Sequence, residues 1–364
     1  MKNIDAFKAH GDIIWNIANL LRGPYRPPQY RRVMIPLTVL RRLDCVLEAS
    51  KDAVIKHHKQ LKEQTDKDGK PKYDAETIEK MVFHKFKLAF FNTSEFTFQS
   101  LLGDPDKLAA NLANYMAGFS SRARKIIEKF KFEEEIEKLE EANRLFDVIK
   151  QVAAVDLHPD TIPNIAMGYL FEDLVRRFNE QANEEAGDHF TPREVIKLMV
   201  NLLFTHDDLV YRKAKLIKIY DPTCGTGGML ISALDEVKRS GGEYRTLKLY
   251  GQERNLITSS IARMNLFLHG VEDFEIIRGD TLANPRHIEG DRLRQFDVIL
   301  ANPPYSIKQW NREAWSSDKW GRNSLGTPPQ GRADYAFQQH ILTSLTAKGR
   351  SAVLWPHGVL FRNE

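Results

Sequence analysis

The carboxy-terminal half of the chain alternates short apolar runs with polar turns and amphipathic segments. Five of these runs have the length of buried strands: residues 216–220, 246–250, 274–277, 296–300 and 351–354. The first run leads through a glycine-rich turn into a helical segment, Met229–Arg239. Strand, glycine turn and helix in this order are typical of an α/β nucleotide-binding fold.

The amino-terminal half has helical periodicity instead. Ile14, Ile17 and Leu21 recur at helical spacing before Gly23, which predicts a helix that ends at the glycine. A second amphipathic helix is predicted after Pro36, where leucines recur at positions 37, 40, 43 and 47.

Two polar stretches interrupt this half. Residues 64–73 are predicted to form a hairpin-like loop. The acidic run 133–141 is predicted to be a helix with a solvated outer face and with Ile136 and Leu139 turned inward.

Prolines at positions 159 and 163 mark the expected domain boundary. Residues 1–160 are expected to form a helical domain for assembly and DNA contact, and residues 161–364 a catalytic domain. The connecting helix is expected to carry Phe171, Leu174 and Phe178.

Composition narrows the class of protein. With 28% charged residues, 2 cysteines and no long apolar stretch, the chain is expected to be cytoplasmic, without disulfides or membrane contact. Cys224 is interpreted as a packing residue. No metal site is expected, because His57 and His58 lack partners at ligand spacing.

Charge leaves the question of nucleic-acid binding open. The net charge of +4 permits such binding without requiring it. Six arginines cluster near the start of the chain, with Tyr25 and Tyr30 between them, and they form either a phosphate-contacting surface or a solvated helix face. These are Arg22, Arg26, Arg31, Arg32, Arg41 and Arg42.

The tetrapeptide Asn302-Pro303-Pro304-Tyr305 has the groups needed to act on a planar amine. The lone pair of adenine's exocyclic amine, or of an amide nitrogen, is delocalised and must be localised before it can attack. The Asn302 side-chain oxygen and the Pro303 carbonyl can accept the two N–H bonds, and consecutive prolines hold both acceptors still. Tyr305 offers an aromatic face for stacking. A rigid turn at a strand end is the alternative interpretation.

A second motif follows the strand 216–220. Its glycines allow close backbone approach at a helix start. An acidic residue at the strand end and no basic residue in the loop favour a ligand with an ammonium group, such as S-adenosylmethionine, over a phosphate. An ordinary turn is the alternative. The residues expected to line the cofactor are Asp221, Thr223, Gly225, Thr226, Gly227 and Gly228.

Two further carboxylates follow successive strands. Glu253, after the strand 246–250, can accept both ribose hydroxyls. Asp280, followed by Thr281, can accept from the amine of the cofactor's adenine. Either carboxylate alone is more often a helix cap or a loop residue, but their order along the chain favours a cofactor site.

Together these motifs resemble the modification (methyltransferase) subunits of type I restriction-modification systems, which are N6-adenine DNA methyltransferases. The resemblance covers nearly the whole chain. The matching stretches are residues 21–23, 31–47, 187–200, 221–230, 250–270, 296–305, 334–337 with 340, and 349–361.

The resemblance implies an α/β fold: a Rossmann-like S-adenosylmethionine-dependent methyltransferase sheet with an N-terminal all-α domain. His189, Phe190 and Thr191 would flank the methionine moiety. Asp221, Glu253 and Asp280 would meet the cofactor, with Thr281 and Asn302 beside them, and residues 302–305 would hold the target base.

The sequence departs from the family in two places. His189 stands where an aromatic Tyr or Phe is usual. The chain also stops at Glu364, whereas the family continues through further strands and a helical region, so the sheet and some subunit contacts are expected to be incomplete.

The implied function is site-specific methylation of an adenine extruded from double-stranded DNA. Expected partners are DNA, a specificity subunit, a restriction (translocase/nuclease) subunit and a second copy of the chain. The alternatives are a protein glutamine methyltransferase and a catalytically silent DNA-binding or assembly subunit. The long connection 306–332, with tryptophans at 310, 315 and 320, either closes over the base or packs on the protein.

Overall fold

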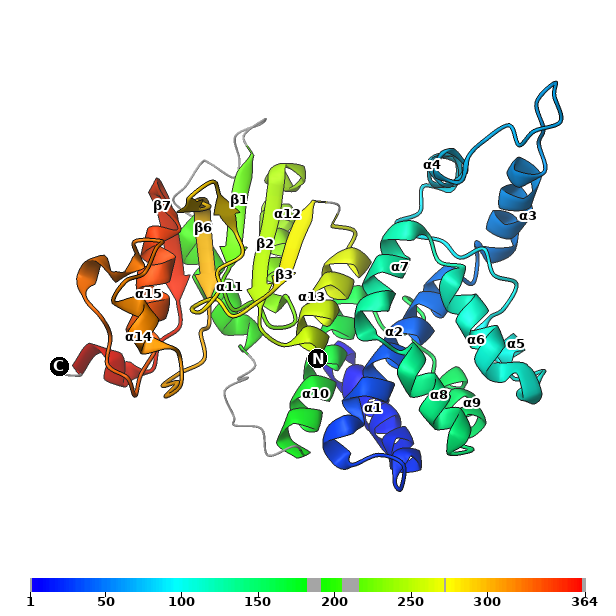
Figure 1. Cartoon of the computed structure of the whole chain (residues 1–364), viewed down its shortest axis with the longest axis horizontal. Coiled ribbons are helices and arrows are strands. Elements are labelled where there is room, and N and C mark those ends of the chain that lie inside the picture. Colours follow the sequence, from blue (N-terminus) through cyan, green and yellow to red (C-terminus); the bar gives the residue numbers. More distant parts are fainter. Residues whose placement is uncertain (1, 182–190, 205–215, 272, 362–364) are drawn as a thin grey trace. The chain divides into compact units, whose positions relative to one another are not determined.

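The computed structural model describes residues 2–181, 191–204, 216–271 and 273–361. Packing divides the chain into two compact units, Met1–Glu184 and Glu185–Glu364 (Figure 1). The division falls later than the boundary expected near residue 160, because helix α10 (Asn164–Gln181) packs on helix α1 (Lys2–Ile17).

The first unit is helical. Besides α1 and α10 it contains α2 (Arg31–Leu47), α3 (Lys51–Lys62), α4 (Ala75–Phe86), α5 (Phe98–Leu101), α6 (Leu108–Ala117), α7 (Ser121–Ile127), α8 (Glu133–Glu141) and α9 (Leu145–Ala153). The acidic helix is confirmed as α8, and its Ile136 and Leu139 are buried. Phe171, Leu174 and Phe178 are buried on α10, where Phe178 packs on Trp15 at 5.1 Å between ring centroids.

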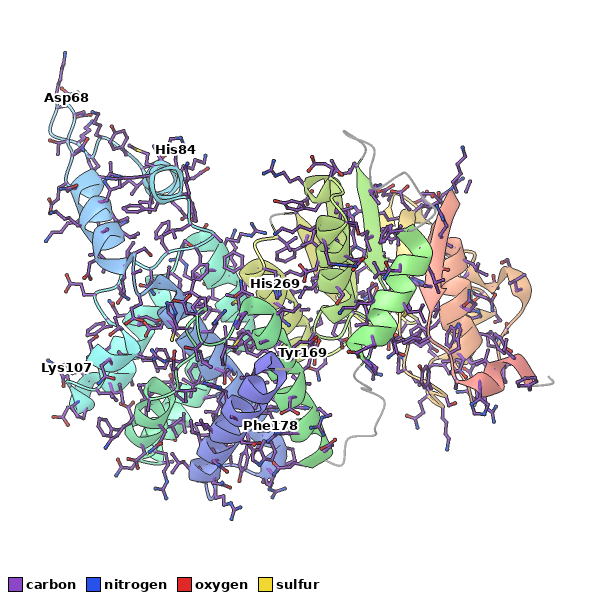
Figure 2. All side chains as sticks on the ribbon, turned by 180° about the vertical axis from the view of Figure 1, so that it is seen from behind. Asp68, His84, Lys107, Tyr169, Phe178 and His269 are labelled. Carbon is purple, nitrogen blue, oxygen red and sulfur yellow. The ribbon has the colours of Figure 1, made fainter. Side chains whose placement is uncertain are left out.

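The predicted hairpin-like loop is also confirmed. Thr65 and Pro71 form an antiparallel bridge between α3 and α4, and the main-chain N–H of Lys72 donates to the Gln64 carbonyl. Asp68 lies at the tip (Figure 2). The first predicted helix ends earlier than expected: α1 stops at Ile17, a 3-10 turn (Ala18–Leu21) follows, and Gly23 comes after it with a φ of +104°, a conformation that favours glycine.

Helix α2 begins at Arg31, so the prediction that it starts after Pro36 is wrong. A proline inside a helix removes one main-chain hydrogen bond. Here Val33, Met34 and Ile35 on the preceding turn are fully buried, and this packing stabilises the helix through the proline.

Two arginines of the amino-terminal cluster serve the fold. Arg42 is fully buried and donates to the carbonyls of Leu157 (2.5 Å) and Ile162 (2.8 Å) and to Asn164 Oδ1 (2.5 Å). Burial lowers the pKa of Arg42 to about 10, so it stays charged at neutral pH. Arg41 donates to another main-chain carbonyl of the same stretch. Both side chains are therefore committed to the first unit rather than to a phosphate surface.

Replacing Arg42 by Met should lower the free energy of unfolding by about 3 kcal/mol, because buried acceptors lose their donor. Urea unfolding measures this loss. Arg32→Met, on the exposed face of the same helix, is the control and should change stability by about 0.5 kcal/mol or less. Equal unfolding midpoints for the two variants would contradict the structural role of Arg42.

The second unit is built on a five-stranded sheet of order β3-β2-β1-β6-β7, in which every pair is parallel. The strands are β1 (Ile217–Asp221), β2 (Leu247–Glu253), β3 (Phe274–Arg278), β6 (Phe296–Ala301) and β7 (Leu345–Val353); β4 (Ile288–Glu289) and β5 (Arg292–Leu293) form a separate hairpin. All five predicted strands are present, although β7 begins six residues before the predicted run 351–354. The predicted α/β class with an amino-terminal helical region is confirmed.

Helices cover both faces of this sheet. One face packs on α11 (Arg193–Phe204), α12 (Gly228–Arg239) and α13 (Leu256–Leu268) through an apolar core. The other face, with Tyr220 and Phe296, packs on α15 (Asp334–Thr343). Because the strands are parallel, their carboxyl ends share one edge, and chain order reverses between β1 and β6, where ligands bind in open α/β sheets.

Candidate active site

The glycine loop after β1 has the backbone conformation that its sequence predicts. Gly225 and Gly227 have φ angles of +52° and +83°, and Gly227 caps α12. A Cβ on Gly227 would come within 3.5 Å of Ala262 in α13, whereas one on Gly225 would meet nothing within 4 Å. The loop is therefore packed on one side and open at Gly225.

Glu253, at the end of β2, holds the glycine loop in place. Its Oε2 accepts from the Gly225 N–H at 3.1 Å, and its Oε1 accepts from the Asn255 N–H at 2.7 Å. Sequence reasoning missed this tie between two loops. A carboxylate oxygen accepts more than one hydrogen bond, so the arrangement is compatible with a ligand hydroxyl at the same group.

Asp221, the last residue of β1, is a buried carboxyl group. It is 2% exposed and accepts from the Thr223 N–H at 3.0 Å. Burial raises the pKa of Asp221 to about 7, and the nearby Glu253 charge adds to the rise. A buried carboxyl of this kind stabilises a bound cation.

Asp280 and Thr281 follow β3. Asp280 Oδ1 accepts from the N–H groups of Leu282 and Ala283, both at 3.0 Å. The Thr281 hydroxyl donates to the Pro222 carbonyl at 2.5 Å, which joins the loops after β3 and β1. The loops from β1, β2 and β3 are thus linked to one another by side chains.

The Asn-Pro-Pro-Tyr segment leaves the end of β6. The Asn302 amide donates to the Thr191 hydroxyl at 2.8 Å, and its oxygen accepts from the Tyr305 hydroxyl at 2.8 Å. The structure therefore brings together Thr191, Asn302 and Tyr305, which the sequence analysis assigned to neighbouring sites. His189 and Phe190 lie outside the described residues.

Asp334, at the start of α15, is hydrogen-bonded to the residue that follows this segment. It is 1% exposed and accepts from the Ser306 N–H at 2.7 Å, where Ser306 has a φ of +54°. Burial raises the pKa of Tyr305, and the Asp334 charge raises it further, so the tyrosine hydroxyl keeps its proton. The sequence indicated Asp334 only as part of a family resemblance, not as a support of Tyr305.

The connection 306–332 packs two of its tryptophans on the protein. Trp310 and Trp315 are buried, with ring centroids 5.6 Å apart, whereas Trp320 is half-buried. Two short helical turns, α14 (Arg312–Trp315) and η7 (Arg322–Leu325), lie within it.

No cluster of three or more His, Cys, Asp or Glu side chains in ion-binding geometry was found among the residues that the structure describes. In the same part of the chain, no helix has the length and apolar character needed to span a bilayer.

Sequence comparison agrees with this geometry. The family described as N-6 DNA Methylase matches residues 164–364, and the HsdM N-terminal domain matches residues 11–152. The chain belongs to the N-6 DNA methylase family. This confirms the family predicted from the sequence motifs.

Individual relatives match large parts of this chain at 25 to 30% sequence identity. The HindI methylase subunit of Haemophilus influenzae is 30% identical, and the match covers 53% of this chain and 40% of that relative. The EcoEI methylase subunit of Escherichia coli is 29% identical, and the match covers 70% of this chain and 49% of that relative. A type I restriction-modification methyltransferase subunit from Streptococcus thermophilus is 25% identical with a TM-score of 0.70, over 98% of this chain and 76% of that one. The chain thus spans less than half the length of these two curated relatives.

Asp221 should make the stability of this methylase pH-dependent. Its pKa is about 7 in the folded chain and near 3.8 when unfolded, so only the unfolded chain releases the proton as pH rises from 4 to 7. Stability should therefore fall across that window, by about 4 kcal/mol. Urea unfolding of the wild type and of Asp221→Asn from pH 4 to pH 8 measures the contribution of Asp221 to this fall. The variant should show no such fall in the free energy of unfolding; the same pH dependence in both proteins would mean that Asp221 ionises normally.

Proposed function

We propose that the chain is the modification subunit of a type I restriction-modification system and transfers a methyl group from S-adenosylmethionine to the N6 nitrogen of adenine in DNA. One observation carries the proposal. Four adjacent parallel strands, β1, β2, β3 and β6, carry Asp221, Glu253, Asp280 and Asn302 at or just beyond their carboxyl ends, so these residues lie along one edge of the sheet.

The residues at that edge fit S-adenosylmethionine. Three carboxyl groups are suited to its cationic and hydroxyl groups, and the open backbone at Gly225 lets it approach the loop. Asp221 would meet its ammonium group, Glu253 its ribose and Asp280 its adenine, with Thr281 and Thr191 beside them. The bound cofactor supplies a methyl group on a sulfonium centre. Four strands spaced by about 4.8 Å span about 14 Å, which is room for both ends of the molecule.

Asn302 and the Pro303 carbonyl are the acceptors for the two N–H bonds of the target amine. By accepting them they would localise the nitrogen lone pair and stabilise the positive charge that develops on nitrogen as the N–C bond forms and the bond between the methyl carbon and the sulfonium sulfur breaks, which leaves a neutral thioether. The N6 proton then leaves to solvent. Most of the rate enhancement comes from orientation, because the reaction needs no covalent enzyme intermediate.

Tyr305 offers its ring for stacking on an adenine extruded from the helix. In this structure its hydroxyl already donates to the Asn302 oxygen. An amine that binds there must share this acceptor with the hydroxyl or displace it. Removing the hydroxyl therefore leaves both the stacking face and the acceptor available.

Partners follow from the family. The relatives above are described as type I restriction enzyme methylase subunits, and we extend to this chain an assembly with DNA, a specificity subunit, a restriction subunit and a second copy of itself. The match to the HsdM N-terminal domain favours this proposal over a protein glutamine methyltransferase. Cofactor binding separates it from a catalytically silent subunit.

The proposed activity is tested by transfer of radiolabelled methyl to DNA, with and without a specificity subunit. The expected product is N6-methyladenine, identified by chromatography of the digested DNA. Label on protein glutamine would support the alternative instead. Cofactor binding without transfer to either substrate would support a non-catalytic role.

Glu253→Ala should weaken S-adenosylmethionine binding by about 1 to 3 kcal/mol, because the ribose hydroxyls lose their acceptor. Calorimetry measures the affinity. Glu243 is a matched control, since it too accepts a main-chain N–H before β2 but lies away from the shared edge. Glu243→Ala should bind normally. If Glu253→Ala also binds normally, the ribose assignment is wrong.

Asn302→Ala, in the subunit assembled with its partners, should abolish methylation while cofactor affinity stays nearly unchanged, because the amine loses its acceptor. Tyr305→Ala should lose base capture, where stacking is worth about 1 to 3 kcal/mol. Tyr305→Phe should remain active. A fluorescent adenine analogue reports base capture, and labelled cofactor reports the rate.

Asn323→Ala is the control for these variants, because the Asn323 amide donates to the Ser316 carbonyl within its own segment and its loss should leave both readings at wild-type levels. Wild-type readings from Tyr305→Ala would mean that the motif is only a rigid turn.

A further inference from the structure

One buried arginine joins the segment 306–332 to the loop after β3. Arg322 is 2% exposed. Its Nη1 donates to the Thr281 carbonyl at 3.0 Å, and its Nη2 donates to the Leu282 carbonyl at 2.8 Å.

The two carbonyls belong to the peptide groups that orient Asp280. The Thr281 carbonyl shares a peptide plane with the Leu282 N–H, and the Leu282 carbonyl shares one with the Ala283 N–H. Those two N–H groups are the donors to Asp280 Oδ1. Because a peptide group is planar, fixing its carbonyl also fixes its N–H. Arg322 therefore acts on the Asp280 carboxylate through two rigid peptide planes.

Arg322 is itself held by an ion pair. Its Nη2 lies 2.7 Å from Asp318 Oδ1 and its Nε lies 3.1 Å from Oδ2, and both side chains are buried. Burial alone would raise the pKa of Asp318, but the hydrogen bonds from Arg322 hold it below the ordinary value. The guanidinium also stacks over the Trp315 ring at 4.3 Å. A planar fork with five donors makes all these contacts at once, which a lysine ammonium cannot do.

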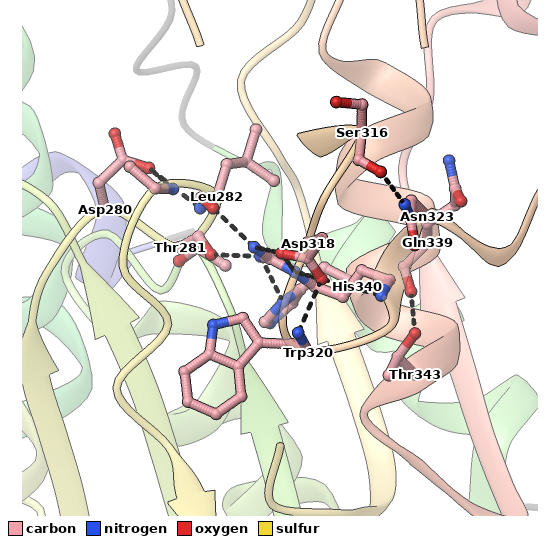
Figure 3. Close-up of polar contacts among 12 residues, drawn as sticks. Asp280, Thr281, Leu282, Ser316, Asp318, Trp320, Asn323, Gln339, His340 and Thr343 are labelled. Carbon is pink, nitrogen blue, oxygen red and sulfur yellow. Dashed lines mark hydrogen bonds and ion pairs between the residues drawn. The ribbon is translucent and has the colours of Figure 1, made fainter. Parts of the chain in front are cut away.

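A further contact leads to β1. Arg322 Nη1 lies 3.4 Å from His340 Nδ1, and His340 Nε2 lies 3.3 Å from the hydroxyl of Tyr220, the residue that precedes Asp221 in β1. Figure 3 shows Asp318, His340, Thr281 and Leu282 gathered around one centre. Leu282 also packs against Trp310 and Trp315 of the segment. Polar and apolar contacts thus join the segment 306–332 to the loop after β3, where the cofactor's adenine is proposed to bind.

We infer that Arg322 is a positioning residue, which sets the Asp280 carboxylate for the cofactor's adenine from the segment that follows the base-binding motif. The inference rests on the proposed function. It makes cofactor affinity depend on a side chain that does not touch the cofactor. It also gives the segment 306–332 a role besides contact with the base.

The test separates positioning from stability. Arg322→Met leaves Asp318 buried without its partner and should lower the melting temperature. Adding Asp318→Asn removes that unpaired charge and keeps an acceptor for the main-chain N–H groups of Trp320 and Arg322. The double variant should recover the part of the melting temperature that was lost to the unpaired charge, while the part due to the Thr281 and Leu282 carbonyls without their donor remains. Its affinity for S-adenosylmethionine, measured by calorimetry, should still be about tenfold weaker.

A cycle with Asp280 makes the readout specific. In an Asp280→Ala background the Asp318→Asn/Arg322→Met pair should cause no further loss of affinity, because the group it positions is gone. Arg294→Met is the control: Arg294 pairs with Glu275 and Glu289 at 3.0 Å each on the same unit, and its loss should leave affinity unchanged.

The outcomes are distinguishable. If the wild type does not bind S-adenosylmethionine, the proposed function fails and this inference fails with it. If the wild type binds and the double variant binds equally well, the inference about Arg322 alone is overturned. Equal additional losses with and without Asp280 would also overturn it, because they would mean a general structural effect.

Discussion

The parallel pairing of β1 with β2 on one side and with β6 on the other is the constraint on which the site depends. Parallel strands end at the same edge, so four loops that are distant along the chain are brought within a few strand spacings of one another. An antiparallel pair at either position would send one of these loops to the opposite edge. The chemistry proposed for this methylase therefore follows first from topology.

The loops at this edge are then fixed by side chains, because neighbouring loops lack the regular hydrogen bonding of the strands. Glu253 holds the Gly225 N–H, Thr281 holds the Pro222 carbonyl, and Asp334 holds the Ser306 N–H. Several of these groups thus have two tasks, since the residues proposed to bind ligands also shape the loops. A substitution at Glu253 therefore changes both the hydrogen bond that holds the Gly225 loop and the proposed contact with the ribose.

Buried charge is used in a similar way in both units. Arg42 in the helical unit and Arg322 in the sheet unit are each almost fully buried, and each donates to main-chain carbonyls of distant segments. A guanidinium has five donors in a fixed plane, so it can join irregular segments whose carbonyls would otherwise be buried without a donor. Arginines in a sequence cluster are therefore not equivalent, and only burial shows which ones are committed to the fold.

The sequence by itself determined the strands, the glycine loop, the acidic helix and the Asn-Pro-Pro-Tyr segment, because periodicity, glycine and proline act over a few neighbouring residues. It also carried the family resemblance. It could not place Pro36 inside a helix, because burial of the preceding turn outweighs a local helix-breaking tendency. Tertiary structure alone decided that Thr191 meets Asn302, that Glu253 holds Gly225, and that Arg322 reaches the peptides around Asp280. These contacts join residues from 28 to 111 positions apart, and such pairs are fixed by sheet order and packing rather than by any local pattern.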